Sequence, residues 1–251
     1  MNFLFHFHLA VSDLDSETSG IGAMLPDIWR MADRRVRARR LAVLSSDDSD
    51  SDKNLSQLLS GIEHHLDVDE WFHQDPLFIE GEKLTRDAFR DANFSAGKML
   101  LMAHIAWELC LDGALLRRLG VENVLADLRR SFNSIPLDVH ELAVRRHLDP
   151  KATARVDVRV FLERLERLFQ DIQAGPWITG YAHGPGLARR LGGVRRRLRL
   201  EGLSGEDEGR LGDVFDELLD EASRVVNSLA DSGRPLLSLL DDPSRQENLQ
   251  T

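Results

Sequence analysis

The sequence predicts an all-α protein that forms one compact helical domain, and two observations indicate this. Apolar residues recur at three- and four-residue steps along much of the chain, whereas stretches with the alternation of a strand are few. Hydrophobic residues make up 42% of the 251 residues, which is enough to fill one substantial core. Helices packed around a single core are therefore the expected architecture.

The helical period is clearest in four segments, Leu55–Leu66, Leu100–Leu119, Val156–Ile172 and Val214–Leu229. Met1–Ala10 fits either a strand or a helix. In a strand His6 and His8 would share a face, whereas in a helix they lie about 200° apart, so that only one can face a given metal. Because the rest of the chain is helical, we expect a helix here as well.

Three stretches interrupt this pattern. Ser45–Asn54 is polar, acidic and of low complexity, which predicts a mobile insertion; it lacks the Gly turn and closing Glu of an EF-hand. Gly175–Gly186 and Gly202–Gly212 are predicted breaks between helices, and the last ten residues are expected to be frayed. We expect a helical domain over residues 1–205, followed by an extra helix and a tail over residues 206–251.

Histidines and carboxylates are concentrated in a way that indicates a metal site. Six of the nine histidines lie in three short stretches, Met1–Ala10, Gly61–Pro76 and Ala103–Asp112. His65, Asp69 and His73 follow one another every four residues, and His104 and Glu108 repeat the step, which stacks side chains on one helix face. Imidazole and carboxylate suit Mn²⁺, Fe²⁺ or Zn²⁺. We expect the two helices to share a metal, the alternative being ordinary structural or surface histidines.

Charge and hydropathy exclude some classes of protein. The net charge of −10 argues against a general nucleic-acid binder, which needs surplus Lys and Arg. Arg30–Arg40 and Arg189–Arg199 are nevertheless basic, either as solvated faces paired with nearby acids or as a docking surface for an acidic partner. No membrane span or signal peptide is expected, so a soluble, cytoplasmic protein is predicted. Cys110, the single cysteine, is expected to be packing rather than a nucleophile.

The same stretches resemble the acyl carrier protein phosphodiesterase family, an all-α group regarded as distant relatives of HD-domain phosphohydrolases. The matching segments lie in order over roughly residues 1 to 200: the opening Met1-Asn2-Phe3-Leu4-Phe5-His6, Gly22–Ile28 with its Asp27, Gly61–Pro76, His104–Leu109, and Tyr181 to Leu191. In Gly61–Pro76 the shared positions are Gly61, Ile62, His65, Asp69 and Pro76.

Several positions depart from the family pattern. Asp and His have exchanged places at His73 and Asp75, His104 and Glu108 stand where carboxylates are expected, and Leu109 replaces a histidine. These changes keep a metal-binding character, but they can alter which metal binds, how many ions bind, or which substrate fits.

The resemblance implies an HD-like fold and hydrolysis of the phosphodiester that joins 4′-phosphopantetheine to a serine of holo-acyl carrier protein. It implies a divalent metal, with Mn²⁺ favoured over Fe²⁺ and Zn²⁺. The expected ligands are His6, Asp27, His65, Asp69, His73, His104 and Glu108, with His6 rather than His8 facing the site.

Asp69 and Asp112 are the candidate catalytic residues, Asp112 also being a candidate for orienting a ligand or a simple helix-end charge. Because acyl carrier proteins are acidic, Tyr181, Arg195, Arg196 and Arg197 are the expected docking residues. The alternatives are a metal-dependent phosphohydrolase acting on another small phosphate ester, and a noncatalytic helical binding protein with a degenerate metal site.

Overall fold

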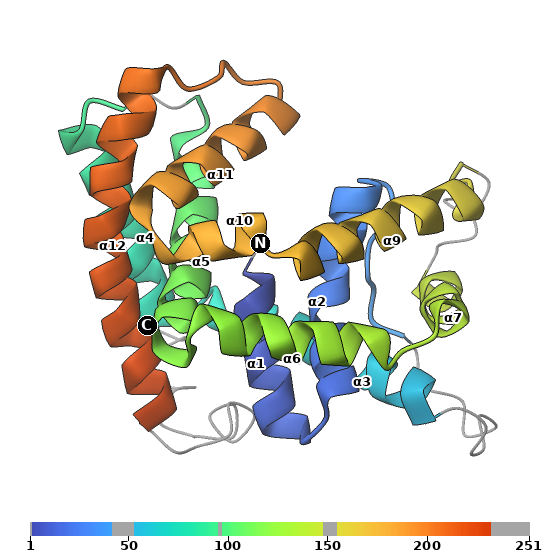
Figure 1. The fold of residues 1–251 in the computed structure, drawn as a ribbon. Coiled ribbons are helices and arrows are strands. Elements are labelled where there is room, and N and C mark those ends of the chain that lie inside the picture. The colour runs from blue at the N-terminus through green and yellow to red at the C-terminus, as the bar shows by residue number, and fades with distance from the viewer. Residues whose placement is uncertain (1, 42–52, 95–96, 148–154, 232–251) are drawn as a thin grey trace. The chain divides into compact units, whose positions relative to one another are not determined.

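The computed structural model describes residues 2–41, 53–94, 97–147 and 155–231, and within these ranges it contains helices and no strand (Figure 1). The all-α prediction is therefore confirmed. The elements are α1 (Phe3–Leu14), α2 (Glu17–Ala32), α3 (Lys53–Phe72), α4 (Pro76–Asp91), α5 (Met99–Leu119), α6 (Val121–Asn133), α7 (Leu137–His147), α9 (Val158–Ala174), α10 (Pro176–Thr179), the 3₁₀ turn η1 (Gly180–Ala182), α11 (Gly184–Arg197) and α12 (Gly205–Asp231). Most of the predicted acidic insertion and the last ten residues lie outside the described ranges.

Three of the four periodic segments fall within helices, and the fourth, Val156–Ile172, begins two residues before α9. The predicted break at Gly202–Gly212 is too long, because α12 begins at Gly205. A Cβ at Gly184 would lie 1.9 Å from the Gly212 carbonyl oxygen. Glycine at these two positions lets α11 and α12 approach closely and does not end the helix.

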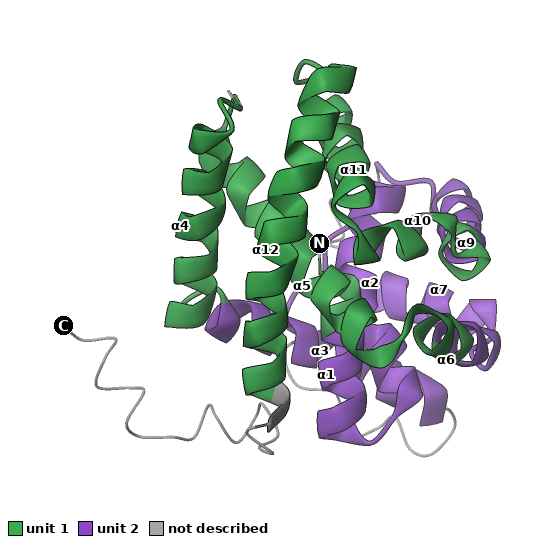
Figure 2. Ribbon diagram, turned by 60° about the vertical axis from the view of Figure 1, so that its left-hand side comes forward, with its two compact units in different colours: residues 1–5, 73–127, 171–232 green, residues 6–72, 128–170, 233–251 purple. Residues whose placement is uncertain are grey.

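The chain divides into two compact units that alternate along the sequence (Figure 2). Unit 1 consists of residues 1–5, 73–127 and 171–232, and unit 2 of residues 6–72, 128–170 and 233–251. This division differs from the predicted boundary after residue 205, because α12 belongs to unit 1 together with α4, α5 and α11. Arg117 of α5 explains part of this, since it donates to Asp216 and Asp220 of α12 at 3.1 Å each.

Unit 1 is built around α5, which runs beside α4 and α12 (Figure 1). Trp107 of α5 is buried against Gly81 of α4, where an added Cβ would lie 2.0 Å from the indole. Among the described helices α5 alone is long and apolar enough, by length and composition, to cross a membrane, although His104, Glu108 and Asp112 interrupt its apolar sequence. The expected absence of a membrane span therefore stays a prediction. Because 78% of its apolar window is buried within the protein, α5 has the character of a core helix. The predicted cytoplasmic location stays a prediction.

Unit 2 depends on the close packing of α2 against α3. A Cβ at Gly22 would lie 2.1 Å from the Leu58 carbonyl oxygen, and one at Gly61 would lie 1.9 Å from the Ser19 carbonyl oxygen. Glycine at both positions therefore lets the two backbones meet directly. The buried pair His64 and Asp13, with Nε2 and Oδ2 2.9 Å apart, joins α3 to α1.

We predict that Gly61→Ala destabilises the protein by about 1–3 kcal/mol, because the new methyl meets backbone atoms that cannot move independently of α2. The matched control is Gly209→Ala in α12, where an added Cβ meets nothing within 4 Å. This control should be neutral or stabilising by up to about 1 kcal/mol. Urea unfolding of both variants measures the difference. Equal effects of the two substitutions would contradict the packing argument.

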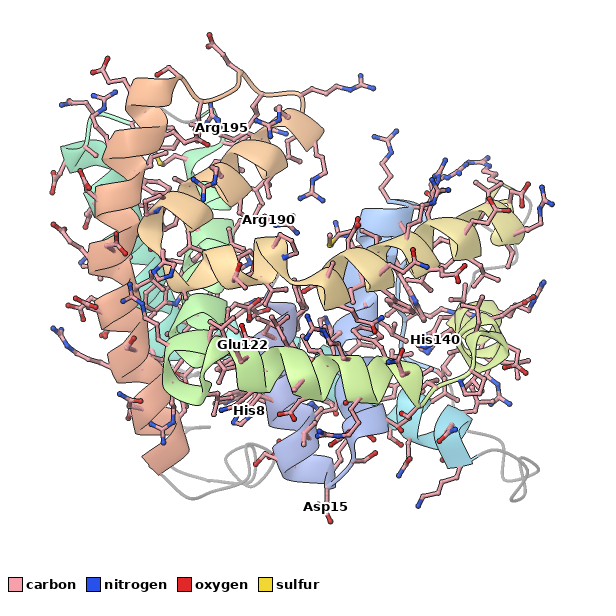
Figure 3. The ribbon with its side chains drawn as sticks, in the orientation of Figure 1. His8, Asp15, Glu122, His140, Arg190 and Arg195 are labelled. Carbon is pink, nitrogen blue, oxygen red and sulfur yellow. The ribbon has the colours of Figure 1, made fainter. Side chains whose placement is uncertain are left out.

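A second prediction concerns His140 of α7, which is 2% exposed and packs against Phe169 (Figure 3). Burial lowers its pKa from 6.5 to about 4, so the folded state holds the imidazole neutral while the unfolded chain binds a proton below pH 6.5. Stability should therefore fall as the pH drops from 6.5 towards 4, with about 2 kcal/mol lost between pH 7 and pH 5 through this residue.

Unfolding free energies of His140→Leu and of the unchanged protein at the two pH values test this expectation. The variant should lose less stability on acidification, whereas the exposed control His183→Leu should behave like the unchanged protein. A variant with an unchanged pH dependence would show that His140 does not carry the effect.

Candidate metal centres

The first candidate metal centre lies in unit 2 and is formed by His6 of α1 with His65 and Asp69 of α3. One ligand atom from each residue lies within 4.8 Å of the others. His6 Nε2 is 3.1 Å from Asp69 Oδ1, and His65 Nε2 is 3.4 Å from Asp69 Oδ2. The four-residue step between His65 and Asp69 thus places both on one face of α3, as the sequence predicts.

A backbone contact fixes the orientation of His65. Its Nδ1 lies 2.8 Å from the carbonyl oxygen of Ala23 in α2, and a carbonyl can only accept, so Nδ1 carries the proton and donates it. Nε2 is then the nitrogen with the free lone pair when the ring is neutral, and it is the nitrogen that faces Asp69. Histidine ligands of metals are usually held in this way by an acceptor behind the ring.

His6 is prepared differently. It is 1% exposed, and its Nδ1 is buried without a hydrogen-bond partner. Burial, reinforced by the charge of His65, lowers the pKa of His6 to about 4, so the ring is neutral at physiological pH and has the form that binds metals. The charge of Asp27 in α2 acts on both His6 and His65 and tends to raise the pKa of each ring. Asp27 therefore lies close to the first centre.

Asp69 is the most accessible member of the centre. Its side chain is 38% exposed, against 1% for His6 and 4% for His65. Burial tends to raise the Asp69 pKa, but hydrogen bonds to His6 and His65 hold it well below its usual range. The carboxylate is therefore ionised, and it forms the side of the centre that solvent can reach.

Asp112 of α5 holds the start of α1. The fully buried carboxylate accepts hydrogen bonds from the backbone N–H groups of Phe5 at 2.9 Å and Leu4 at 3.4 Å. The first N–H groups of a helix have no partners within the helix, and a negative charge is favourable there. Asp112 thus caps α1 immediately before His6. Asp112 therefore acts on His6 through the backbone of α1, and its predicted roles in orienting a ligand and in catalysis stay predictions.

The second candidate centre lies in unit 1 and is formed by His73, His104 and Glu108, which also offer ligand atoms within 4.8 Å of one another. His73 follows the end of α3, whereas His104 and Glu108 lie one turn apart on α5. Both imidazole Nε2 atoms face the same oxygen, Glu108 Oε1, at 3.5 Å from His73 and 3.4 Å from His104. Glu108 is 4% exposed.

Glu82 of α4 supports His104 from behind, with Oε1 3.0 Å from Nδ1. Burial tends to raise the Glu108 pKa, but the nearby imidazoles of His104 and His73 are among the groups that hold it well below its usual range. Asp75 accepts from the Leu77 N–H at 2.9 Å and caps α4. His73 is the residue of this segment that contacts Glu108.

The seven predicted ligands thus fall into two groups. His6 joins His65 and Asp69, with Asp27 acting on both rings, and His73 joins His104 and Glu108. The helical geometry of α1 brings His6 to the first group, while His8 belongs to neither. The expectation that His65, Asp69, His104 and Glu108 share one ion stays a prediction, because the two groups belong to different units.

The predicted docking residues need correction. Tyr181 is fully buried, and burial raises the pKa of its hydroxyl, so it cannot form part of a docking surface. Arg195 is 6% exposed; its Nε donates to the Glu201 carbonyl at 3.0 Å and its guanidinium lies over the Phe94 ring, so it is a packing residue of unit 1. Arg196 and Arg197 are exposed, as predicted.

Two of the six arginines in the first basic cluster are paired with acidic neighbours. Arg40 contacts Asp67 at 2.6 Å and Glu70 at 2.7 Å, and Arg35 contacts Asp33 at 2.6 Å. These two arginines fit the interpretation of a solvated face, and the choice between that and a docking surface for the whole cluster stays a prediction. Cys110 is buried, and burial raises the pKa of its thiol, which fits the expected packing role.

Sequence reasoning missed Glu82 and the Ala23 carbonyl, the two groups that orient the ligand histidines. Comparisons with family models, curated proteins and solved structures find no match to this chain. The site chemistry and the motifs quoted above are therefore the basis for inferring a function.

We predict that His6→Ala weakens Mn²⁺ binding at the first centre at least about tenfold, since even groups behind a ligand commonly contribute ten- to hundredfold. His8→Ala, two residues further along α1 and outside both centres, should leave binding unchanged. Titration of Mn²⁺ followed by electron paramagnetic resonance compares the two variants. Equal losses would mean that His6 has no specific role.

Proposed function

We propose that the protein is a metal-dependent phosphodiester hydrolase, and that the first centre holds its catalytic ion. The observation that supports this is the convergence of the resemblance's key positions from three separate segments. His6 comes from the opening segment, Asp27 from α2, and His65 with Asp69 from α3, and all four interact within unit 2. If these four residues had no shared function, nothing would require them to lie together in the folded protein.

The donor set fits a divalent ion. Ligand atoms about 2.1 Å from an ion lie about 3.0 Å apart in octahedral and 3.4 Å apart in tetrahedral geometry. The separations of 3.1 and 3.4 Å from Asp69 oxygens to the two Nε2 atoms lie in this range. Neutral imidazole and ionised carboxylate are, in addition, the forms that Mn²⁺, Fe²⁺ and Zn²⁺ require.

The residues of the first centre would have different roles in the reaction. A bound divalent ion would polarise a phosphoryl oxygen and lower the pKa of a coordinated water. His65, locked by the Ala23 carbonyl, and His6, held by the capped start of α1, provide fixed ligand nitrogens. Asp69 is ionised and faces solvent, so the phosphodiester is expected to approach from its side, where its carboxylate can accept a proton from an attacking water.

We further propose that the substrate is holo-acyl carrier protein, as the resemblance implies. The structure offers exposed positive charge on α11, where Arg189, Arg196 and Arg197 all reach solvent. Such a surface would attract an acidic helical protein and raise its rate of association. Removal of 4′-phosphopantetheine would convert the holo form to the apo form.

Mass spectrometry of holo-acyl carrier protein after incubation with the protein and Mn²⁺ tests the function directly. The carrier protein should lose the mass of 4′-phosphopantetheine, and Asp69→Asn should abolish the loss while His8→Ala retains it. If the carrier protein is unchanged but bis-p-nitrophenyl phosphate is hydrolysed in a manner that needs Asp69, the substrate is another phosphate ester. If neither is hydrolysed, the proposed function is wrong.

The docking surface leads to a separate prediction. Reversing charge in the double variant Arg189→Glu/Arg196→Glu should raise KM for the carrier protein about tenfold or more at low salt, because two attractive charges become repulsive. Hydrolysis of the small phosphodiester should stay nearly unchanged. The effect on KM should shrink as the salt concentration rises above physiological strength. Equal loss of both activities would contradict a docking role.

A further inference from the structure

We propose that the protein binds a second divalent ion at His73, His104 and Glu108, and that this ion is held independently of the ion at His6, His65 and Asp69. The two ligand sets share no residue, and each is complete within its own unit. The inference concerns metal binding alone and does not depend on the proposed hydrolase activity.

The distances within the second centre favour an ion over simple hydrogen bonding. Hydrogen bonds between nitrogen and a carboxylate oxygen are about 2.7–3.2 Å long. The two Nε2 atoms lie 3.4 and 3.5 Å from Glu108 Oε1, which is longer than this range. Donor atoms about 2.1 Å from a tetrahedral ion are about 3.4 Å apart, so the observed spacing is that of ligands around a common centre.

Glu82 supplies an independent sign of metal binding. By accepting from Nδ1 of His104 it leaves Nε2 as the nitrogen that faces Glu108 and His73. A carboxylate behind a histidine in this way raises the basicity of the ligand nitrogen and fixes the ring. The packing of Gly81 on Trp107 sets α4 against α5 next to this contact, because Gly81 precedes Glu82 and Trp107 lies one turn from His104.

The two centres differ in accessibility. The His73 and His104 side chains are 29% and 30% exposed, whereas those of His6 and His65 are 1% and 4% exposed. The imidazole ligands of the second centre therefore reach solvent, whereas in the first centre only the Asp69 carboxylate does. We expect the exposed imidazoles to release their ion faster, so that a chelator removes the second ion first.

The donor set points to the class of ion. Two imidazoles and one carboxylate suit Zn²⁺ or Fe²⁺, and the Irving–Williams order gives Zn²⁺ the higher affinity than Mn²⁺ for such a site. Two nitrogen donors make the second centre less suited to Mn²⁺ than an all-carboxylate centre would be.

Metal content after dialysis against Zn²⁺, measured by inductively coupled plasma mass spectrometry, tests the proposal. The unchanged protein should hold two ions per chain, and His104→Ala and His65→Ala should each hold one. His183→Ala, an exposed histidine of unit 1 outside both centres, should still hold two. A single ion per chain in the unchanged protein that is lost in both variants would mean a shared site, and an unchanged content in His104→Ala would mean no second site; either result overturns the proposal.

A gentler substitution guards against misfolding. Glu82→Gln removes only the charge behind His104 and should weaken Zn²⁺ binding at the second centre ten- to hundredfold in competition with a chelating dye. Glu80→Gln, an exposed neighbour on α4, is the matched control and should change nothing. If Glu82→Gln and Glu80→Gln bind Zn²⁺ with the same affinity, Glu82 does not support a metal ligand and the proposed second site is wrong. If the unchanged protein holds two ions but hydrolyses neither the carrier protein nor the small phosphodiester, the result contradicts the proposed function and leaves the second metal site standing.

Discussion

The contact between α2 and α3 is the constraint on which the first centre depends. Gly22 and Gly61 let the two backbones approach to a distance that any side chain would prevent, and this brings the Ala23 carbonyl to His65 Nδ1. That single hydrogen bond selects the tautomer of His65 and aims Nε2 at Asp69. The same packing places Asp27, one turn beyond Ala23 on α2, where its charge acts on both imidazoles. The packing of the α2 backbone against α3 thus determines the tautomer of His65 and the position of Asp27, which both lie a few residues after the glycines.

Burial and charge act in opposite directions on these imidazoles, and the balance differs between them. His6 loses solvation without a partner for Nδ1, so its pKa falls and the ring stays neutral. His65 loses as much solvation, but its hydrogen bonds to Asp69 and the Ala23 carbonyl raise its pKa above the usual value. Binding of an ion must therefore displace a proton from His65 when that ring is charged, whereas His6 is ready to bind. As the pH falls, His65 should be protonated before His6, and the affinity of the centre for a metal should fall with that protonation.

The sequence predicts the helices well because their apolar periods are long, and it predicts the ligand pairs because a four-residue step has a fixed meaning on a helix. It does not predict the groups behind the ligands. Ala23 contributes only a carbonyl, which every residue has, and Glu82 depends on the register of α4 against α5 that Gly81 and Trp107 set. Arg195 illustrates the opposite error: its charge belongs to a basic run in the sequence, but its guanidinium is buried and lies over the ring of Phe94, a residue distant in sequence. Glycines in the sequence also predict a break that extends too far, because Gly205, Gly209 and Gly212 lie within α12.

Both centres begin where the chain passes from one unit to the other. His6 is the first residue of unit 2 after the capped start of α1, and His73 is the first residue of unit 1 after the end of α3. Each therefore ties a junction of the chain to a helix within the unit it enters. Buried imidazole and carboxylate groups cost solvation energy in the folded protein, and an ion that binds only the folded state returns stability as RT ln(1 + [ion]/Kd). Each bound ion would therefore stabilise the unit that supplies its ligands, α1 with α3 in the first centre and the turn before α4 with α5 in the second.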